Sequence, residues 1–467
     1  MADYSLLSLR ENNPYRRFMN VVLADGSVSD RELSQALEAN EHVRELSIYT
    51  LTTRGNWDLF LRVVATREFL NMIVLRDHNA DEVADDPHFV TMRTIGILQA
   101  IQLNSAIHTV CLKSVQLSSA PIASFLDAAT SIRTLHLHNI RMEAQEEEGG
   151  AQELAVAVQR NRHIRALELE YLSDVYLLPI LSCLAANTHL EKLALAFIKD
   201  EDEEISLAAS TGLKSLLESN ANFVELKLIR FSFEAESFLP ISQGLIRNEK
   251  ITDLKFDGCD IGDARVFQRI IRSKSNLRAL NLHLCSIHWR VLSATLFTNM
   301  VRADSPLRSL GLICSMLTDE GYIALLSLVE KSKLERLSIV SISGDGRFLA
   351  LMSSIPKMRI TALQVGMDRD GATRWSSAVV QAVKKNASLR SVVVDDFSNG
   401  TFNENDWRKL NNYGARNEAL AQLTAAPATI PNGAWPKAFK AAQDIGPDAV
   451  ARILFAIGSS VGPVESD

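Results

Sequence analysis

The sequence predicts an α/β solenoid in which short parallel strands alternate with helices, and three observations lead to this fold class. An apolar-x-x-apolar-x-apolar motif occurs thirteen times, at steps of 25 to 37 residues. The last two apolar residues of each motif alternate with period two, which indicates one face of a strand. A stretch with apolar residues three and four apart follows, which indicates a helix. A fixed period of this length is typical of a solenoid rather than a globular enzyme domain.

The motif is clearest in the sixth repeat, where Leu190, Leu193 and Leu195 carry it. One unit has too little apolar surface to form a core alone, so we expect neighbouring units to share a continuous core. Because helices are wider than strands, the stack should curve with its strands on the inside. The thirteen motifs begin at Val43, Leu70, Ile107, Ile132, Ile164, Leu190, Phe223, Ile251, Leu277, Leu307, Leu334, Ile360 and Leu389.

Many of the predicted helices stop at an asparagine. Asparagine tolerates the left-handed backbone conformation that ends a helix, so we expect it to turn the chain back toward the next strand. That strand begins two to four residues later. The asparagines in question are Asn40, Asn161, Asn187, Asn220, Asn248 and Asn386.

The tenth repeat shows the fullest motif, with Leu307, Leu310 and Leu312 followed by Leu317 to Gly321 before the next helix. This segment resembles the leucine-rich repeat family, in its long-repeat, ribonuclease-inhibitor-like class. The segment from 251 to 263 is similar, and the resemblance covers about residues 40 to 397. It implies a horseshoe with parallel strands on the concave face and helices on the convex face.

One position departs from the family pattern. The third residue after the second strand leucine is often Asn or Cys in the family and satisfies the backbone there. In this chain apolar packing should mostly replace that ladder of hydrogen bonds. The residues at this position are Val115, Ile140, Leu172, Ile198, Phe231, Cys259, Cys285, Ser315 and Ile342.

The repeats divide the chain into three expected parts. Residues 1–38 should form an N-terminal cap, residues 39–400 the solenoid of about thirteen repeats, and residues 401–467 a C-terminal helical cap. In the last part, the pieces 416–420, 430–431 and 434–436 resemble a C-terminal module of leucine-rich repeat proteins in diatoms. We expect Trp435 and Phe439 to pack against the last repeat.

The composition is that of a soluble protein with a large core, at 47% hydrophobic and 22% charged residues. No run reaches the ~20 apolar residues of a membrane helix, and the first residues lack the features of a signal peptide. We therefore expect a cytoplasmic protein, with the nucleus as the alternative. The five cysteines are too scattered for a disulfide framework. Cys259 and Cys285 hold equivalent repeat positions and should be buried packing residues, since a zinc site would need Cys-x-x-Cys or His spacing.

The net charge of −7 is unevenly distributed. Three loops after the strands of the second, fourth and sixth repeats carry five acids each and no bases. Two interpretations stay open: these loops are simply solvated, or they form an acidic rim that steers a basic partner. Their acids are Asp77, Asp81, Glu82, Asp85 and Asp86, then Glu143, Glu146, Glu147, Glu148 and Glu153, then Asp200, Glu201, Asp202, Glu203 and Glu204.

Strand residues beside the buried leucines should point into the hollow, where the family usually binds its partners. Strands lie about 4.8 Å apart, so side chains on adjacent units can touch. Aromatic residues supply anchoring area there and charges set orientation. His136 or His138 should lie near Glu168 or Glu170, which indicates ion pairs between adjacent strands; a metal site is the alternative. Arg230 is also expected on this face. The predicted partner-binding residues are Lys113, His136, His138, Glu168, Glu170, Tyr171, Lys192, Phe197, Lys227, Lys255, Asp257 and His283.

Motifs for catalysis are missing from the sequence. It has no phosphate-binding Gly-x-x-x-x-Gly-Lys-Ser/Thr loop, no Gly-x-Ser-x-Gly elbow and no His-Glu-x-x-His helix. Bases are interspersed with acids rather than grouped with aromatics, which disfavours a nucleic-acid groove. We expect no enzyme activity and no cofactor. We also expect no nucleic-acid, membrane or small-molecule partner. The expected partner is a protein, and the acidic loops suggest that it is basic.

The sequence thus predicts a non-catalytic intracellular protein-protein interaction scaffold or recognition subunit. Two alternatives remain open. One is an inhibitor or activator of an enzyme or small GTPase, similar to ribonuclease-inhibitor-like or GTPase-activating leucine-rich repeat proteins. The other is a substrate adaptor of a ubiquitin ligase, although the N-terminus does not resemble an F-box.

Overall fold

The computed structural model forms two compact units, residues 1–251 and 252–467, and each is described by itself. We call them the N-terminal unit and the C-terminal unit. The structure describes residues 18–22, 30–39, 43–49, 58–76, 87–115, 119–140, 147–172, 174–196, 205–231, 236–261, 264–283, 285–287, 297–298, 306–313, 319–341, 346–367, 369–386, 388–396, 406, 408–410, 412–413 and 417.

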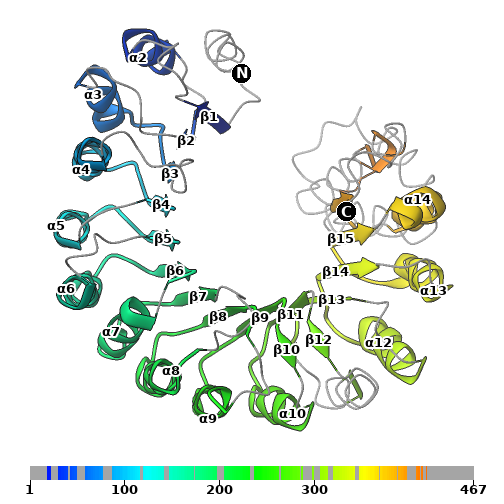
Figure 1. Ribbon diagram of the computed structural model, residues 1–467. Helices are drawn as coiled ribbons and strands as arrows, with labels where there is room; N and C mark the ends of the chain where they lie inside the picture. The colour runs from blue at the N-terminus through cyan, green and yellow to red at the C-terminus, as the bar shows by residue number, and fades with distance from the viewer. Residues whose placement is uncertain are drawn as a thin grey trace, which may run out of the picture. The chain divides into compact units, whose positions relative to one another are not determined.

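In the N-terminal unit, strands and helices alternate along the chain, and the helices lie on one side of the strands (Figure 1). Neighbouring strands pair in chain order and in parallel. The strands are β1 (Phe18–Val22), β2 (Glu45–Tyr49), β3 (Met72–Arg76), β4 (Thr109–Lys113), β5 (Thr134–His138), β6 (Ala166–Glu170), β7 (Lys192–Ala196) and β8 (Glu225–Ile229). The helices are α2 (Asp30–Ala39), α3 (Asp58–Thr66), α4 (Pro87–Leu103), α5 (Ser119–Ala128), α6 (Glu147–Arg160), α7 (Asp174–Leu184), α8 (Leu207–Ser219) and α9 (Phe238–Arg247).

The C-terminal unit repeats the same alternation, again with parallel strands paired in chain order. Its strands are β9 (Asp253–Asp257), β11 (Ala279–His283), β13 (Ser309–Ile313), β14 (Arg336–Ser341), β15 (Ala362–Met367) and β16 (Ser391–Asp396), with a separate short pair of β10 (Asp260–Ile261) and β12 (Ser286–Ile287). Its helices are α10 (Ala264–Ser273), α12 (Asp319–Lys331), α13 (Gly346–Ser354), the 3-10 helix η2 (Ile355–Lys357) and α14 (Arg369–Lys385).

The predicted fold class, an α/β solenoid of parallel strands alternating with helices, is therefore confirmed. Each of the thirteen predicted motifs carries a strand that begins two residues after the motif's first apolar position, from β2 to β16. One further strand, β1, precedes them. It lies within residues 1–38, where we expected a cap, and pairs in register with β2.

The core of each unit lies between its strands and its helices. In β5 the second and fourth residues, Leu135 and Leu137, are buried, whereas the first, third and fifth are partly exposed. Leu213 and Leu216 of α8 are also fully buried. Burial of such a side chain contributes roughly 1.5–3 kcal/mol. The same alternation is found in β6, β8, β9 and β11, whereas in β3, β4 and β7 the third residue is buried as well.

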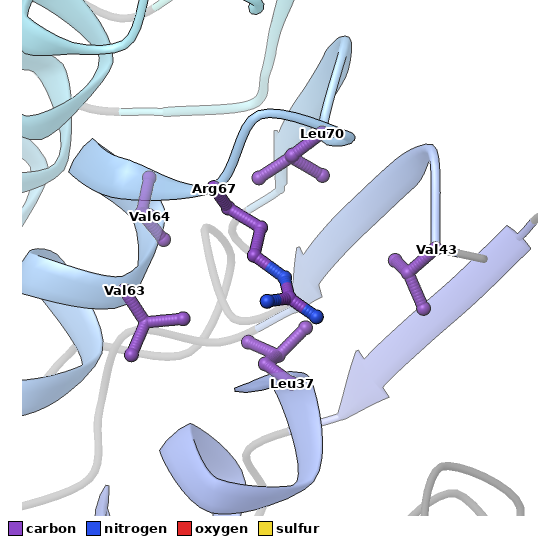
Figure 2. A pocket seen from close by; sticks show the side chains of 6 residues that line it. All are labelled: Leu37, Val43, Val63, Val64, Arg67 and Leu70. Carbon is purple, nitrogen blue, oxygen red and sulfur yellow. The ribbon is translucent and has the colours of Figure 1, made fainter. Parts of the chain in front are cut away.

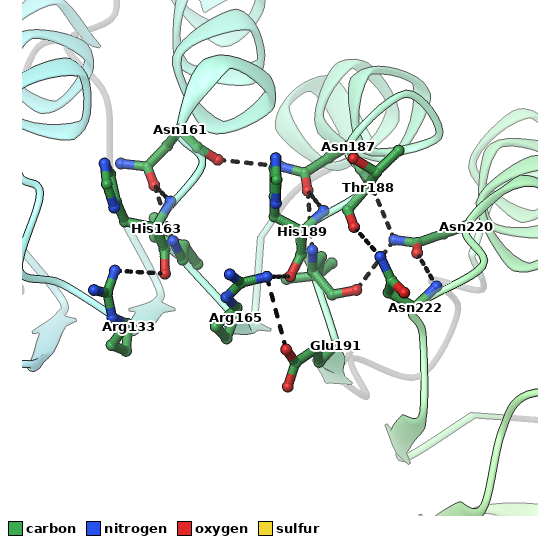
Figure 3. Close-up of polar contacts among 12 residues, drawn as sticks. Arg133, Asn161, His163, Arg165, Asn187, Thr188, His189, Glu191, Asn220 and Asn222 are labelled. Carbon is green, nitrogen blue, oxygen red and sulfur yellow. Dashed lines mark hydrogen bonds and ion pairs between the residues drawn. The ribbon is translucent and has the colours of Figure 1, made fainter.

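At the ends of α4, α6, α7, α8, α9 and α14, a buried asparagine joins the helix to the repeat before it. The side-chain amide of Asn161 donates to the Leu126 carbonyl at 2.6 Å. Its side-chain oxygen accepts from the amides of His163 at 2.8 Å and Ile164 at 2.9 Å (Figure 3). It thereby satisfies groups that the helix end would leave unpaired. We call these residues the asparagine ladder: Asn104, Asn161, Asn187, Asn220, Asn248, Asn386 and Asn417.

The ladder corrects our expectation that these asparagines adopt the left-handed conformation. Asn220 (φ −83°, ψ 107°) and Asn248 (φ −72°, ψ 115°) are extended. The side chain, rather than the backbone, ends the helix, because its amide has a partner in the preceding repeat. Asn40 lies outside the described residues. Left-handed residues instead follow directly after strands, at Ser114, Asn139, Tyr171, Arg230 and Gly258.

The apolar position after each strand behaves as predicted. Its residues are buried in the core, and those that the structure describes are Val115, Ile140, Leu172, Phe231, Cys259 and Cys285. The aliphatic and aromatic members contribute packing, whereas the Cys285 thiol also donates to the Phe256 carbonyl of the preceding repeat at 3.4 Å.

We predict that Asn161→Ala lowers the free energy of unfolding by about 3 kcal/mol, because it leaves several buried backbone groups without a partner. Asn222→Ala is a matched control. Its amide also bonds a carbonyl one repeat away, that of Thr188, but at an exposed position, and its loss should cost less than about 1 kcal/mol. Urea unfolding followed by circular dichroism measures both. Equal losses would contradict a special role for the ladder.

Candidate partner-binding site

The open face of the N-terminal strands carries the candidate site. Strand pairing is in register, so the third residues of successive strands form one row and the fifth residues form a second row. Row three contains Cys111, His136, Glu168, Ala194 and Lys227, and row five contains Lys113, His138, Glu170, Ala196 and Ile229. This regular spacing brings residues about 30 positions apart in the sequence into lateral contact.

Two histidine–glutamate pairs cross from β5 to β6. His136 Nδ1 lies 2.7 Å from Glu168 Oε2, and His138 Nδ1 lies 2.7 Å from Glu170 Oε2. The exposed fractions of the four side chains lie between 23% and 33%. The predicted cross-strand pairing is thus confirmed, and the two pairs stand one above the other on the face. A charge-assisted hydrogen bond of this length fixes both side chains in orientation.

Glu170 is the carboxylate at the centre of this arrangement. Its hydrogen bond with His138 holds the pKa of Glu170 below the ordinary 4.5, against the opposing effect of burial. The charges of Lys227 and Lys113 act in the same direction. Glu170 therefore stays ionised well into the acid range and presents a fixed negative charge between two lysines.

Tyr171 follows β6 in a left-handed conformation, with φ 57°. Its amide donates to the Ala196 carbonyl at 2.8 Å. The tyrosine ring meets the His138 ring edge-on, at 4.8 Å between centroids, and the Arg230 guanidinium lies 5.7 Å from the ring centroid. Left-handed backbone is unfavourable for a tyrosine, so this geometry is held by its surroundings. It places an aromatic ring and a cation directly beside the histidine–glutamate pairs.

Small or buried residues separate the long side chains on this face. Cys111, Ala194 and Ala196 are 2%, 5% and 3% exposed although they belong to the open rows. Burial raises the pKa of the Cys111 thiol to about 11. The thiol is therefore protonated at neutral pH and poorly suited to nucleophilic chemistry. The site provides oriented polar and aromatic groups for binding.

The remaining predicted residues separate into three cases. Lys192 lies on the same face but pairs with Glu225 of β8, at 3.0 Å, in the row formed by the first strand residues. Lys255, Asp257 and His283 belong to the C-terminal unit, where Asp257 and His283 are register partners on β9 and β11. Phe197 lies outside the described residues, as do the acidic loop segments 77–86, 143–146 and 200–204. The loop prediction is wrong for Glu147, Glu148 and Glu153, because helix α6 already begins at Glu147.

Sequence reasoning placed Arg230 on this face without linking it to Tyr171, and it missed Cys111, Ala194 and Ala196. The strand register could have placed these three residues on the open face, since each occupies the third or fifth position of its strand. The left-handed backbone conformation of Tyr171 could not be predicted from the sequence, because tyrosine does not favour it.

Cys259 and Cys285 are both fully buried, as predicted for packing residues, and the hydrogen bond with Cys259 raises the pKa of the Cys285 thiol. Within the described residues, no three His, Cys, Asp or Glu side chains are grouped so that they could hold a metal ion. None of the described helices is long and apolar enough to cross a membrane.

A cavity between α2 and α3 is lined by Leu37, Val43, Val63, Val64, Arg67 and Leu70 (Figure 2). Its volume is about 10 Å³, which is close to that of one water molecule. The Arg67 guanidinium bonds the Glu38 carbonyl at 2.8 Å, so its charge is used within the fold. This cavity is a packing gap between two repeats and too small for an organic ligand.

Comparison with known proteins adds little beyond the fold. No family model and no curated protein matches the chain. Among solved structures it is similar to "Leiomodin-1 Actin-Binding Site 2 (ABS2)", with 15% sequence identity and a TM-score of 0.24, over 42% of this chain and 91% of that one. A likeness this distant carries no argument about function. The strand–helix units themselves define a solenoid like that of leucine-rich repeat proteins.

We predict a pH signature for Glu170. Its pKa is lowered by folding, so the stability gained from its ionisation is present above pH 4.5 and is lost as the pH falls below that value. The difference in unfolding free energy between the wild type and Glu170→Gln should therefore shrink as the pH falls below 4.5. Urea titrations across this range measure it. A difference that grows toward acid pH would contradict the assigned pairing.

Proposed function

We propose that the protein is a non-catalytic, intracellular scaffold or recognition subunit of the ribonuclease-inhibitor-like class, which binds a protein partner. The observation that carries this proposal is the group formed by His138, Glu170, Tyr171 and Arg230 on the open strand face. Aromatic and arginine side chains dominate the binding energy of protein interfaces, particularly where they are already oriented.

The shape of the site favours a protein over a small molecule. Its groups are spread over several neighbouring strands on an open face, whereas small-molecule sites are concave pockets that enclose most of the ligand. Lys113 and Lys227 stand on either side of the histidine–glutamate pairs, on β4 and β8. Such alternating charges set the orientation of a partner surface more than they set its affinity.

The acidic loop segments supply the second part of the proposal. They follow the carboxyl ends of β3, β5 and β7 in the chain. A basic partner would be steered toward them at long range and then held by the strand face. We place this encounter in the cytoplasm.

We predict that exchanging the charges of one pair, with His138→Glu and Glu170→Arg, removes partner binding without lowering the melting temperature. In the variant, Glu at position 138 and Arg at position 170 still attract each other. The partner, however, meets negative charge where the wild type has histidine and positive charge where it has glutamate. The measurement is quantitative affinity capture from native lysate with mass spectrometry. The protein most enriched by the wild type should fall by about tenfold or more, the effect typical of losing a central contact.

The control exchanges an ion pair between helices α8 and α9, with Arg247→Glu and Glu218→Arg, which should leave capture intact. Tyr171→Gly tests the ring separately, because glycine adopts the left-handed conformation of residue 171 without strain. Capture that survives both His138→Glu/Glu170→Arg and Tyr171→Gly would overturn the assignment of this face.

A further inference from the structure

The helix-to-strand turns of the C-terminal unit form a continuous edge. Successive turns are joined by backbone hydrogen bonds: the Arg308 amide donates to the Arg278 carbonyl at 2.7 Å, and the Glu335 amide donates to the Arg308 carbonyl at 2.8 Å. The series goes on through Thr361 to Arg390, with bonds of 2.7 Å and 2.8 Å. Equivalent residues of adjacent turns are therefore only about a strand spacing apart, roughly 4.8 Å.

This edge is strongly basic. We define the basic turn edge as the exposed residues Arg278, Arg308, Lys333, Lys357, Arg359 and Arg390. Among the described residues of the same turns, Glu335 is the one acid, and Arg308 already pairs with it at 3.0 Å. Like charges on adjacent strands repel and destabilise the folded state. The edge thus concentrates positive charge that its own acids do not neutralise.

In the N-terminal unit, arginines at the equivalent turns form hydrogen bonds that link one turn to the next. There, Arg133 and Arg165 donate to the carbonyls of His163 and His189 in the next turn, at 3.3 Å and 3.1 Å (Figure 3). In the C-terminal unit Arg308 makes the equivalent bond, to Lys333. Within the described part of the chain, the side chains of Arg278, Lys333 and Arg359 form no ion pair and no hydrogen bond to another turn. Their charges are available to a partner.

Attraction between cations and helix C-termini explains only part of this charge. A cation in the last helical turn is favourable there, and Lys331 of α12 and Lys385 of α14 already occupy such positions. Arg278 and Arg359 come later in the chain, next to the strands. Their addition increases the mutual repulsion that an external anion would relieve.

The chemistry of the edge favours an acidic polypeptide over nucleic acid. Single-stranded nucleic acids are bound by aromatic side chains interleaved with cations, and the described turn residues at 274–278, 306–308, 332–335, 358–361, 386 and 388–390 include no aromatic. Glu335 lies in the middle of the series, where a continuous row of phosphates would meet it. Separate carboxylates on a peptide can be arranged on either side of it.

We propose that the basic turn edge of the C-terminal unit is a docking surface for an acidic segment of a partner protein. This inference goes beyond the proposed function, because it concerns another unit and another surface. Attraction of this kind accelerates association and weakens steeply as salt screens it.

The test uses the full chain and a fluorescein-labelled oligoglutamate peptide, followed by fluorescence anisotropy at low and moderate salt. The triple variant Arg278→Glu, Lys333→Glu and Arg359→Glu should weaken peptide binding by about tenfold or more. The control variant Arg31→Glu, Arg62→Glu and Arg162→Glu makes the same change in net charge at exposed residues of the N-terminal unit. It should bind the peptide nearly as well as the wild type, and thermal melting verifies that both variants fold.

Three outcomes would overturn the proposal: no peptide binding by the wild type at low salt, equal weakening in both variants, or tighter binding of a single-stranded oligonucleotide of matched charge. The exchange His138→Glu with Glu170→Arg should leave peptide binding unchanged. A failure of the strand-face proposal is thereby distinguished from a failure of this one.

Discussion

The structure depends on the buried asparagine that ends α4, α6, α7, α8, α9 and α14. A helix followed by a tight return leaves carbonyls and turn amides without partners, and burying them unpaired would cost about 1–3 kcal/mol for each group. The Asn187 side chain donates to the Asn161 carbonyl at 3.3 Å and accepts from the amides of His189 and Leu190 at 2.8 Å and 3.0 Å. Each repeat thus depends on its neighbour for the backbone bonds of its turn, as it does for its core.

This constraint has a functional consequence. Where Asn161 and Asn187 close the turns, β6 and β7 begin in register with the strands before them, and the third and fifth residues of these strands line up. The histidine–glutamate pairs, Tyr171 and Arg230 meet only because of this register. Partly exposed pairs contribute little to stability. We therefore attribute their arrangement to recognition rather than to folding.

The sequence predicted the positions of the strands well, because burial of alternating residues is a strong and local signal. It also predicted the pairing of His138 with Glu170, since a constant register fixes which residues are adjacent. It failed at the turns between helix and strand. The role of Asn161 requires the Leu126 carbonyl, 35 residues earlier, and residue type alone suggested a left-handed turn instead. The left-handed Tyr171 was missed because tyrosine has no preference for that conformation.

Amide hydrogen exchange of the wild-type protein tests the central claim most directly, namely that the asparagine ladder fixes the turns. If the asparagine side chains hold the turns, the turn amides of His163, His189 and Leu190 exchange slowly, with protection comparable to that of the strand amide of Leu137. Exchange of these turn amides as fast as that of exposed loops would contradict it, because the asparagine oxygens would then not hold them.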